Sequence, residues 1–365
     1  MTATKARPGL YIHIPFCKSK CAYCAFASYA GCADLIGPYL KKLSSEAAQY
    51  KNKFKPKTLY IGGGTPSLLD PAQISFLINI IEKNFGPVKK FEEATFECNP
   101  ESLTEDKIKL LKTAGFTRLS IGMQAMDDKH LKLIGRAHNK KQFLQVYKTA
   151  QKYFDNLNID IIAALPGQSM ADFKNGLAQA LKLGPKHLSI YGLMAEEGAK
   201  LFDAGFIPDD DLCRKMLEHA ADYLRARGWR QYEISNFAKE GCESLHNINY
   251  WRGGDYLGLG CAAASYIKGA RRCNTEDLQK YIKAAKTPCE SERLTGKRKL
   301  GEQIILGLRM TDGINLTAPM QKTFAADFKQ LTTRGLLSKE GKNIKLTEEG
   351  KYMANEVWRH FVEPF

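Results

Sequence analysis

The sequence has few of the features that would place it in a membrane or outside the cell. No stretch approaches the roughly 18–20 consecutive apolar residues of a membrane-spanning helix. The first ten residues are polar and have no secretory core, and repeats and low-complexity tracts are absent. We therefore expect a cytoplasmic protein without a transmembrane segment, with its 365 residues divided between one large unit and smaller ones.

The ten cysteines are too few for a disulfide framework in a chain of this length. Seven are scattered, which is typical of buried single thiols. The other three lie within the eight residues from Cys17 to Cys24. In a reducing compartment such close spacing indicates a metal site or catalysis.

The net charge of +15 comes from lysines spread along the whole chain. A solvated, lysine-rich surface accounts for this pattern. Nucleic acid, an anionic membrane surface and an acidic ligand such as a porphyrin propionate are the alternatives, and charge alone does not choose between them. We expect no nucleic-acid partner.

Short apolar runs alternate with amphipathic stretches through the first two-thirds of the chain. This alternation predicts a parallel α/β sheet, open or closed into a barrel, because right-handed crossovers put the carboxyl ends of such strands at one edge. Six strands are expected, at residues 10–16, 58–61, 93–97, 118–121, 158–163 and 187–191.

The candidate metal-binding and ligand-binding residues follow the ends of these strands. They are Cys17 to Cys24, Gly62 to Pro66, Glu97, Gln124 and Asp160. In barrel-like α/β folds that edge is where sites are built. Glycines at 62 to 64 let the backbone approach a ligand closely, although a plain turn has the same composition.

The pattern changes after residue 192. From about residue 300 the sequence predicts two helices, a short strand pair near residues 344–346 and a closing helix. This outline is winged-helix-like. Such a module binds nucleic acid in some proteins and serves for packing or docking in others.

The three clustered cysteines form a C-x₃-C-x₂-C motif on Cys17, Cys21 and Cys24. Iron–sulfur clusters are held by cysteine thiolates, four for a complete cubane, so three ligands leave one iron open. An open position is what a catalytic metal needs. A structural zinc is the alternative, with His13 or Cys32 as its fourth ligand.

The C-x₃-C-x₂-C spacing after the first strand resembles the radical-SAM signature. The resemblance implies a partial (β/α)6 TIM-like barrel and a [4Fe–4S] cluster. It also implies that S-adenosylmethionine (SAM) binds the open iron and is cleaved reductively, and that an electron donor serves the cluster.

A closer resemblance covers about residues 9 to 350, to the oxygen-independent coproporphyrinogen III oxidase family. It rests on residues 11–17, 61–67, 119–124, 158–160, 165–168 and 232–238. By this resemblance the SAM site is lined by Tyr11, Gly63, Gly64, Thr65, Glu97, Gln124, Arg136 and Asp160.

That family has an oxidative decarboxylase branch and a haem-chaperone branch. The decarboxylases carry a further cysteine two residues after the motif, where this chain has Phe26, and a long N-terminal extension, for which Cys17 comes too early. The segment His246-Asn247-Ile248-Asn249-Tyr250-Trp251 resembles the H-N-x-x-Y-W haem motif of the chaperones. Imidazole is a common axial ligand of haem iron, so His246 is the expected haem ligand.

Three positions depart from the family pattern. Ala25 stands where an acidic residue is usual, Leu245 where a basic residue is common, and Ala264 where the family has a histidine. If that histidine helps to bind haem elsewhere, this chain binds haem differently or more weakly.

The sequence thus predicts a radical-SAM haem chaperone that delivers haem to an acceptor, such as a membrane-bound respiratory enzyme. SAM-dependent decarboxylation of coproporphyrinogen III is the first alternative, and radical-SAM chemistry on another substrate is the second; whether the chain turns over a substrate stays open. The expected units are a core barrel over residues 1–200, an extension carrying the haem motif over 201–290, and a mostly helical, winged-helix-like module over 291–365.

Overall fold

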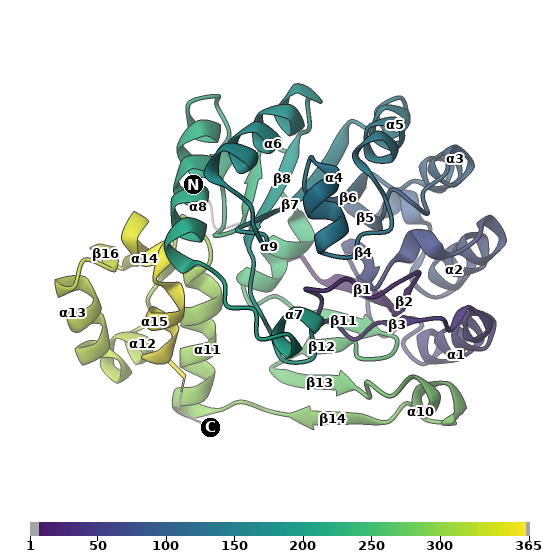
Figure 1. Cartoon of the computed structure of the whole chain (residues 1–365). Helices are drawn as coiled ribbons and strands as arrows, with labels where there is room; N and C mark the ends of the chain where they lie inside the picture. The colour runs from purple at the N-terminus through teal and green to yellow at the C-terminus, as the bar shows by residue number, and fades with distance from the viewer. Residues whose placement is uncertain (1–6, 363–365) are drawn as a thin grey trace.

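The computed structural model describes residues 7–362 (Figure 1). Residues 1–6, part of the polar start considered above, lie outside the described residues. Six parallel strands follow one another across the sheet in chain order. They are β1 (Gly9–Ile14), β4 (Thr58–Gly63), β5 (Glu93–Cys98), β6 (Arg118–Gln124), β7 (Asn156–Ala163) and β8 (His187–Gly192).

Helices follow the strands and cover the outer face of the curved sheet, as Figure 1 shows. They are α1 (Ile36–Ala48), α2 (Pro71–Phe85), α3 (Glu105–Ala114), α4 (Asp128–Leu133), α5 (Lys140–Ala150), α6 (Met170–Lys182) and α8 (Asp210–Arg225), with short 3₁₀ turns at Ala33–Leu35, Pro66–Leu68 and Val88–Lys90. The predicted partial (β/α)6 barrel is confirmed.

Several barrel helices begin or end at a capping residue that the sequence displays. Thr104 accepts a hydrogen bond from the backbone N–H of Lys107 at the start of α3, and Gly115 stops that helix in a left-handed conformation with φ of 104°. Asp70 and Asn139 make capping boxes at the starts of α2 and α5. These side chains satisfy backbone donors that have no partner inside the helix.

Every barrel strand alternates in polarity along its length. In β1 the side chains of Leu10, Ile12 and Ile14 are buried in the core against the helices. In β7 the polar Asn158 and Asp160 point the opposite way and line a cavity inside the barrel. Since successive side chains of a strand point to opposite faces, the barrel has an apolar outside and a polar inside.

The sheet extends beyond the six predicted strands at both edges. On the β1 side it continues with β11 (Tyr256–Leu259), parallel to β1, and then with antiparallel β12 (Ala264–Ile267), β13 (Ala270–Asn274) and β14 (Cys289–Glu292). On the β8 side it ends with antiparallel β10 (Asn236–Ala238) and β9 (Arg230–Gln231). The remaining short elements of this part are β2 (Phe16–Cys17), β3 (Tyr29–Ala30), α7 (Lys200–Asp203), α9 (Leu245–Trp251) and α10 (Leu278–Lys283).

The C-terminal module has its own apolar core, which includes Ile304, Phe324, Leu331 and Val357. Its helices surround a three-stranded antiparallel sheet in the order β15-β17-β16. Helices before a small sheet agree with the predicted winged-helix-like outline. The elements are α11 (Gly296–Leu308), β15 (Ile314–Asn315), α12 (Ala318–Thr323), α13 (Ala325–Thr333), β16 (Leu337–Glu340), β17 (Asn343–Leu346), α14 (Glu348–Tyr352) and α15 (Ala354–Arg359).

Candidate functional site

A cavity of about 380 Å³ opens at the carboxyl ends of the barrel strands and reaches down into the barrel. This size suits one drug-sized ligand. Most of the residues predicted from the sequence line it together, namely Cys17, Cys21, Cys24, Gly63, Gly64, Thr65, Glu97, Gln124, Arg136 and Asp160.

Cys17 ends β2, Cys21 and Cys24 lie in the loop that follows it, and all three are half-buried. Burial raises the pKa of the Cys17 and Cys24 thiols, so a nearby positive charge is needed to hold them as thiolates. No group of three or more His, Cys, Asp or Glu side chains in residues 7–362 is arranged to hold a metal ion. A cubane cluster offers each thiolate a separate iron, so three thiols that line one cavity fit that group.

The side chains considered for a zinc site are engaged elsewhere. His13 bonds the Tyr11 hydroxyl through Nδ1 at 2.8 Å and the Ala27 carbonyl through Nε2 at 2.9 Å. The thiol of Cys32 points to the carbonyl of Ala30. Neither side chain is free to act as a fourth ligand beside the three cysteines.

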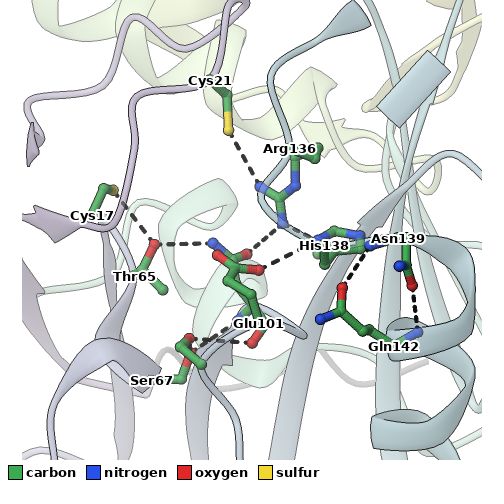
Figure 2. A network of polar contacts seen from close by, with 12 residues as sticks. Cys17, Cys21, Thr65, Ser67, Glu101, Arg136, His138, Asn139 and Gln142 are labelled. Carbon is green, nitrogen blue, oxygen red and sulfur yellow. Dashed lines mark hydrogen bonds and ion pairs between the residues drawn. The ribbon is translucent and has the colours of Figure 1, made fainter. Parts of the chain in front are cut away.

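Figure 2 shows a polar network behind the cysteines. Thr65 donates its hydroxyl to the sulfur of Cys17 at 3.4 Å, and the amide of Asn99 donates to Thr65 at 3.0 Å. Arg136 donates to the sulfur of Cys21 at 3.5 Å and to Oδ1 of Asn99 at 2.7 Å. One chain of hydrogen bonds therefore orients two of the three thiols.

The same network continues below the cavity wall. The hydroxyl of Ser67 accepts the backbone N–H of Asn99 at 2.9 Å, and Glu101 lies 3.4 Å from Nδ1 of His138 (Figure 2). Arg136 also donates to the carbonyl of Gly122 at 2.9 Å. The guanidinium is thus fixed from three sides, which leaves its charge beside Cys21.

Asn99 is one of the site residues that the sequence analysis missed. It follows Glu97 by two residues at the end of β5 and lines the cavity. Its amide is the bridge between Thr65 and Arg136. Its position just after a barrel strand was the available signal, the same one that selected Glu97.

The glycine segment at the end of β4 brings backbone against the segment that carries the three cysteines. The N–H of Gly64 bonds the carbonyl of Ile14 at 2.9 Å, and the N–H of Thr65 bonds that of Phe16 at 2.8 Å. A Cβ at Gly63, whose φ is 110°, would lie 2.6 Å from the His13 ring. Close approach as well as backbone conformation therefore requires glycine here.

Two carboxyl groups face the interior of the cavity. Glu97 accepts hydrogen bonds from the Tyr60 hydroxyl at 2.6 Å and the Gly63 N–H at 3.2 Å, and burial raises its pKa to about 7. Asp160 accepts from Asn158 at 2.7 Å and Ser120 at 3.3 Å, and burial raises its pKa as well. Both groups are positioned acceptors for hydroxyl or ammonium donors of a ligand.

A buried cation completes the interior. Arg118, at the start of β6, is 2% exposed and lines the cavity. Its charge lowers the pKa of both Glu97 and Asp160, against the larger effect of burial. Nothing in the sequence analysis selected Arg118, because it begins its strand and does not follow one.

Gln124 lies where β6 loses its regular pairing with β7, at a bulge between Gly122 and Gln124. It has a φ of 66°, a conformation that side chains other than glycine rarely adopt. Such strain is typical of functional sites, and Gln124 lines the cavity. Tyr11, by contrast, is not among the residues that line the cavity.

His246 lies apart from this cavity, at the opposite ends of the strands. It is in α9 and is fully buried, with Nδ1 2.8 Å from Oγ1 of Thr58 and Nε2 2.7 Å from the hydroxyl of Tyr250. Burial lowers its pKa to about 3. Its neighbour Asn247 does line the cavity, at the floor.

The arginines near the haem motif are paired within the protein. Arg252 binds Asp312, Arg271 binds Glu292 and Glu302, and Arg272 donates to the Tyr50 hydroxyl. The three departures from the family pattern are spread out. Ala25 lines the cavity mouth, Leu245 begins α9, and Ala264 begins β12.

Comparison with known proteins agrees with this geometry. Residues 11–179 match the Radical SAM superfamily model, and residues 294–353 match the HemN C-terminal domain. The solved structure described as coproporphyrinogen III oxidase (HemN) from Escherichia coli has a TM-score of 0.83 at 24% identity, covering 97% of this chain and 90% of that one. The barrel, the three-cysteine motif and the match to the Radical SAM superfamily model together place the chain in the radical SAM class.

Curated relatives define the family more narrowly. Heme chaperone HemW of Bacillus subtilis (strain 168) is 34% identical over 96% of this chain and 98% of its own length. Heme chaperone HemW of Escherichia coli (strain K12) is 38% identical over 70% of this chain and 68% of its own length. The chain belongs to the HemW family.

Proposed function

We propose that this protein is a radical SAM haem chaperone. It holds a [4Fe–4S] cluster on Cys17, Cys21 and Cys24, binds SAM in the adjoining cavity, and carries haem to an acceptor haemoprotein. The observation that supports this best is the convergence of the three thiols and the predicted SAM residues other than Tyr11 on one cavity of about 380 Å³. Relatives named as haem chaperones support the haem part.

Five of the cavity residues have a role that we infer from their position and bonding. Backbone groups of Gly63 and Gly64 meet the polar end of SAM, Glu97 and Asp160 accept from its hydroxyl or ammonium donors, and Arg136 supplies positive charge beside the three-cysteine motif. When bound, the cluster supplies the electron for reductive cleavage of SAM. The described residues hold, orient and shield the ligand.

The partners follow from the same proposal. They are haem, an electron donor for the cluster, and an acceptor haem enzyme such as a membrane-bound respiratory complex, with no nucleic acid among them. No helix in residues 7–362 is both long enough and apolar enough to cross a membrane. We place the protein in the cytoplasm.

His246 is the proposed axial ligand of haem. Its low pKa keeps the imidazole neutral, which is the form that ligates metals. Both of its nitrogens are occupied in the described structure, so haem binding requires them to leave Thr58 and Tyr250.

Coproporphyrinogen III decarboxylation is less well supported. Phe26 stands in place of the additional cysteine and is 70% exposed at the cavity mouth. The likeness to the solved oxidase, at 24% identity, concerns the fold alone. Turnover of coproporphyrinogen III by the reconstituted protein would favour the hypothesis that it is an oxidase.

The test uses anaerobically reconstituted protein. Iron and sulfide are measured for the wild type and for Cys17→Ala, Cys21→Ala and Cys24→Ala, with Cys289→Ala, an exposed thiol far along the chain, as the matched control. Haem is then titrated and followed at its Soret band, with His246→Ala alongside. We expect cluster loss only in the three motif variants, and saturable one-to-one haem binding that His246→Ala abolishes. No specific haem binding would refute the chaperone proposal.

A further inference from the structure

Helix α9 contributes residues to two separate sites in the barrel. His246 faces the amino ends of the barrel strands, where Gly9 and Thr58 contact it. The next residue, Asn247, lines the floor of the cavity whose mouth holds the cysteines. Adjacent residues of a helix point about 100° apart, so one helix can serve both surfaces.

His246 cannot ligate iron in its present position. Its ring is 0% exposed and packs between Tyr60 and Tyr250, with ring centroids 5.2 Å and 4.8 Å away. Each nitrogen already has a hydrogen-bond partner. A porphyrin plane needs both a free nitrogen and open space beside it, so α9 must move before haem binds.

Polar contacts hold both ends of α9, and Ile248 and Trp251 pack on a small apolar cluster. Glu93, at the start of β5, accepts the backbone N–H groups of Leu245 and His246 at 3.0 Å each and the hydroxyl of Ser244 at 3.3 Å. The other end is held to the C-terminal module by Arg252, which binds both carboxylate oxygens of Asp312. A displacement of α9 that frees His246 therefore also removes Asn247 from the cavity floor.

We propose that α9 is a movable floor with two positions, docked with His246 sequestered or withdrawn with His246 available to haem, so that SAM and haem oppose each other's binding. The inference rests on the proposed function. A ligand that fills the cavity binds the docked position better, because Asn247 is part of the wall. By linkage, haem lowers SAM affinity by the factor by which SAM lowers haem affinity.

The first test loosens the docked position. Thr58→Val and Tyr250→Phe each remove one hydrogen bond to His246 while nearly keeping the shape of the side chain. Losing one such bond raises the withdrawn population, and with it haem affinity, about five- to tenfold. Tyr256→Phe is the matched control, because its ring packs on Tyr250 with centroids 4.5 Å apart, and we expect no change there.

The second test measures the coupling itself. SAM affinity is determined with and without saturating haem, and haem affinity with and without SAM. Hydrogen exchange at the amides of Leu245 and His246 reports the position of α9. We expect SAM to slow this exchange and haem to speed it. Asn247→Ala should bind SAM more weakly, still bind haem, and lose the coupling.

The outcomes separate this inference from the proposed function. Tighter haem binding by Thr58→Val and Tyr250→Phe, with reciprocal effects of SAM and haem, supports the movable floor. Equal or weaker haem binding in both variants overturns it, while saturable binding by the wild type that depends on His246 keeps the chaperone proposal. Saturable binding that ignores His246→Ala overturns the movable floor alone. Absence of haem binding in every variant that still binds SAM overturns both.

Discussion

Glu97 gives a quantitative test of the electrostatics inside the barrel. Burial raises its pKa from 4.5 to about 7, although the hydrogen bonds from Tyr60 and Gly63 act in the opposite direction. The difference between 4.5 in the unfolded chain and about 7 in the folded chain corresponds to about 3 kcal/mol. Protonation of this one carboxyl should therefore be visible in the free energy of unfolding.

The sign follows from proton linkage. The folded chain holds the proton of Glu97 more tightly than the unfolded chain does, so stability falls as the pH rises between the two pKa values. The favourable contribution is complete below pH 4.5 and lost once the pH passes about 7. Glu97→Gln keeps a neutral group, since its oxygen can accept the N–H of Gly63 and its amide can donate to Tyr60.

The assay is urea unfolding of the reduced, metal-free protein at pH 5 and pH 8. We expect Glu97→Gln to unfold like the wild type near the acid end and to be more stable by up to about 3 kcal/mol at pH 8. Glu196→Gln, at an exposed position by the cavity mouth, is the control and should change nothing. Parallel curves for Glu97→Gln and the wild type would refute the raised pKa. The same variant should bind SAM more weakly, which separates function from stability.

Three further outcomes are expected. Asn99→Ala breaks the bridge between Thr65 and Arg136, so SAM should bind roughly tenfold more weakly, as measured by equilibrium dialysis, while the cluster iron content stays unchanged. Arg309→Met leaves the fully buried Glu233 without its ion pair and should cost about 3–5 kcal/mol in unfolding free energy at neutral pH, with recovery expected in Glu233→Gln combined with Arg309→Met. Phe26→Cys should not confer coproporphyrinogen III turnover. Decarboxylated product detected by chromatography would show that the missing cysteine alone separates this chain from the oxidase.

The sequence predicted the barrel well because its signals are local. Helices α2 and α3 begin at capping side chains and end at glycines that the chain itself displays. The strands that extend the sheet beyond the barrel were harder to predict. Strand β11 pairs with β1 across about 245 residues of intervening chain. No local pattern in the Gly- and aromatic-rich segment predicts that pairing.

The same division holds for the site. Residues just after strand ends reach one cavity because parallel strands share an edge, which made Glu97 and Gln124 predictable. The position of His246 was not predictable, because it depends on a short helix that crosses to the opposite ends of the strands. The motif around His246 indicates a ligand type but carries no information about which face of the barrel it meets.

The polar inside of the barrel explains why α9 is the part that can respond to a ligand. Parallel strands usually read as continuous apolar runs, yet each strand here alternates, as Leu119, Ser120 and Ile121 do in β6. The apolar half is packed against helices and is rigid, so the walls of the cavity are fixed by the core. At the floor Asn247 comes from α9, a helix of seven residues held by Glu93 at one end and by Arg252 at the other. A change in cavity occupancy is therefore transmitted through α9 more readily than through the strands, and α9 carries His246.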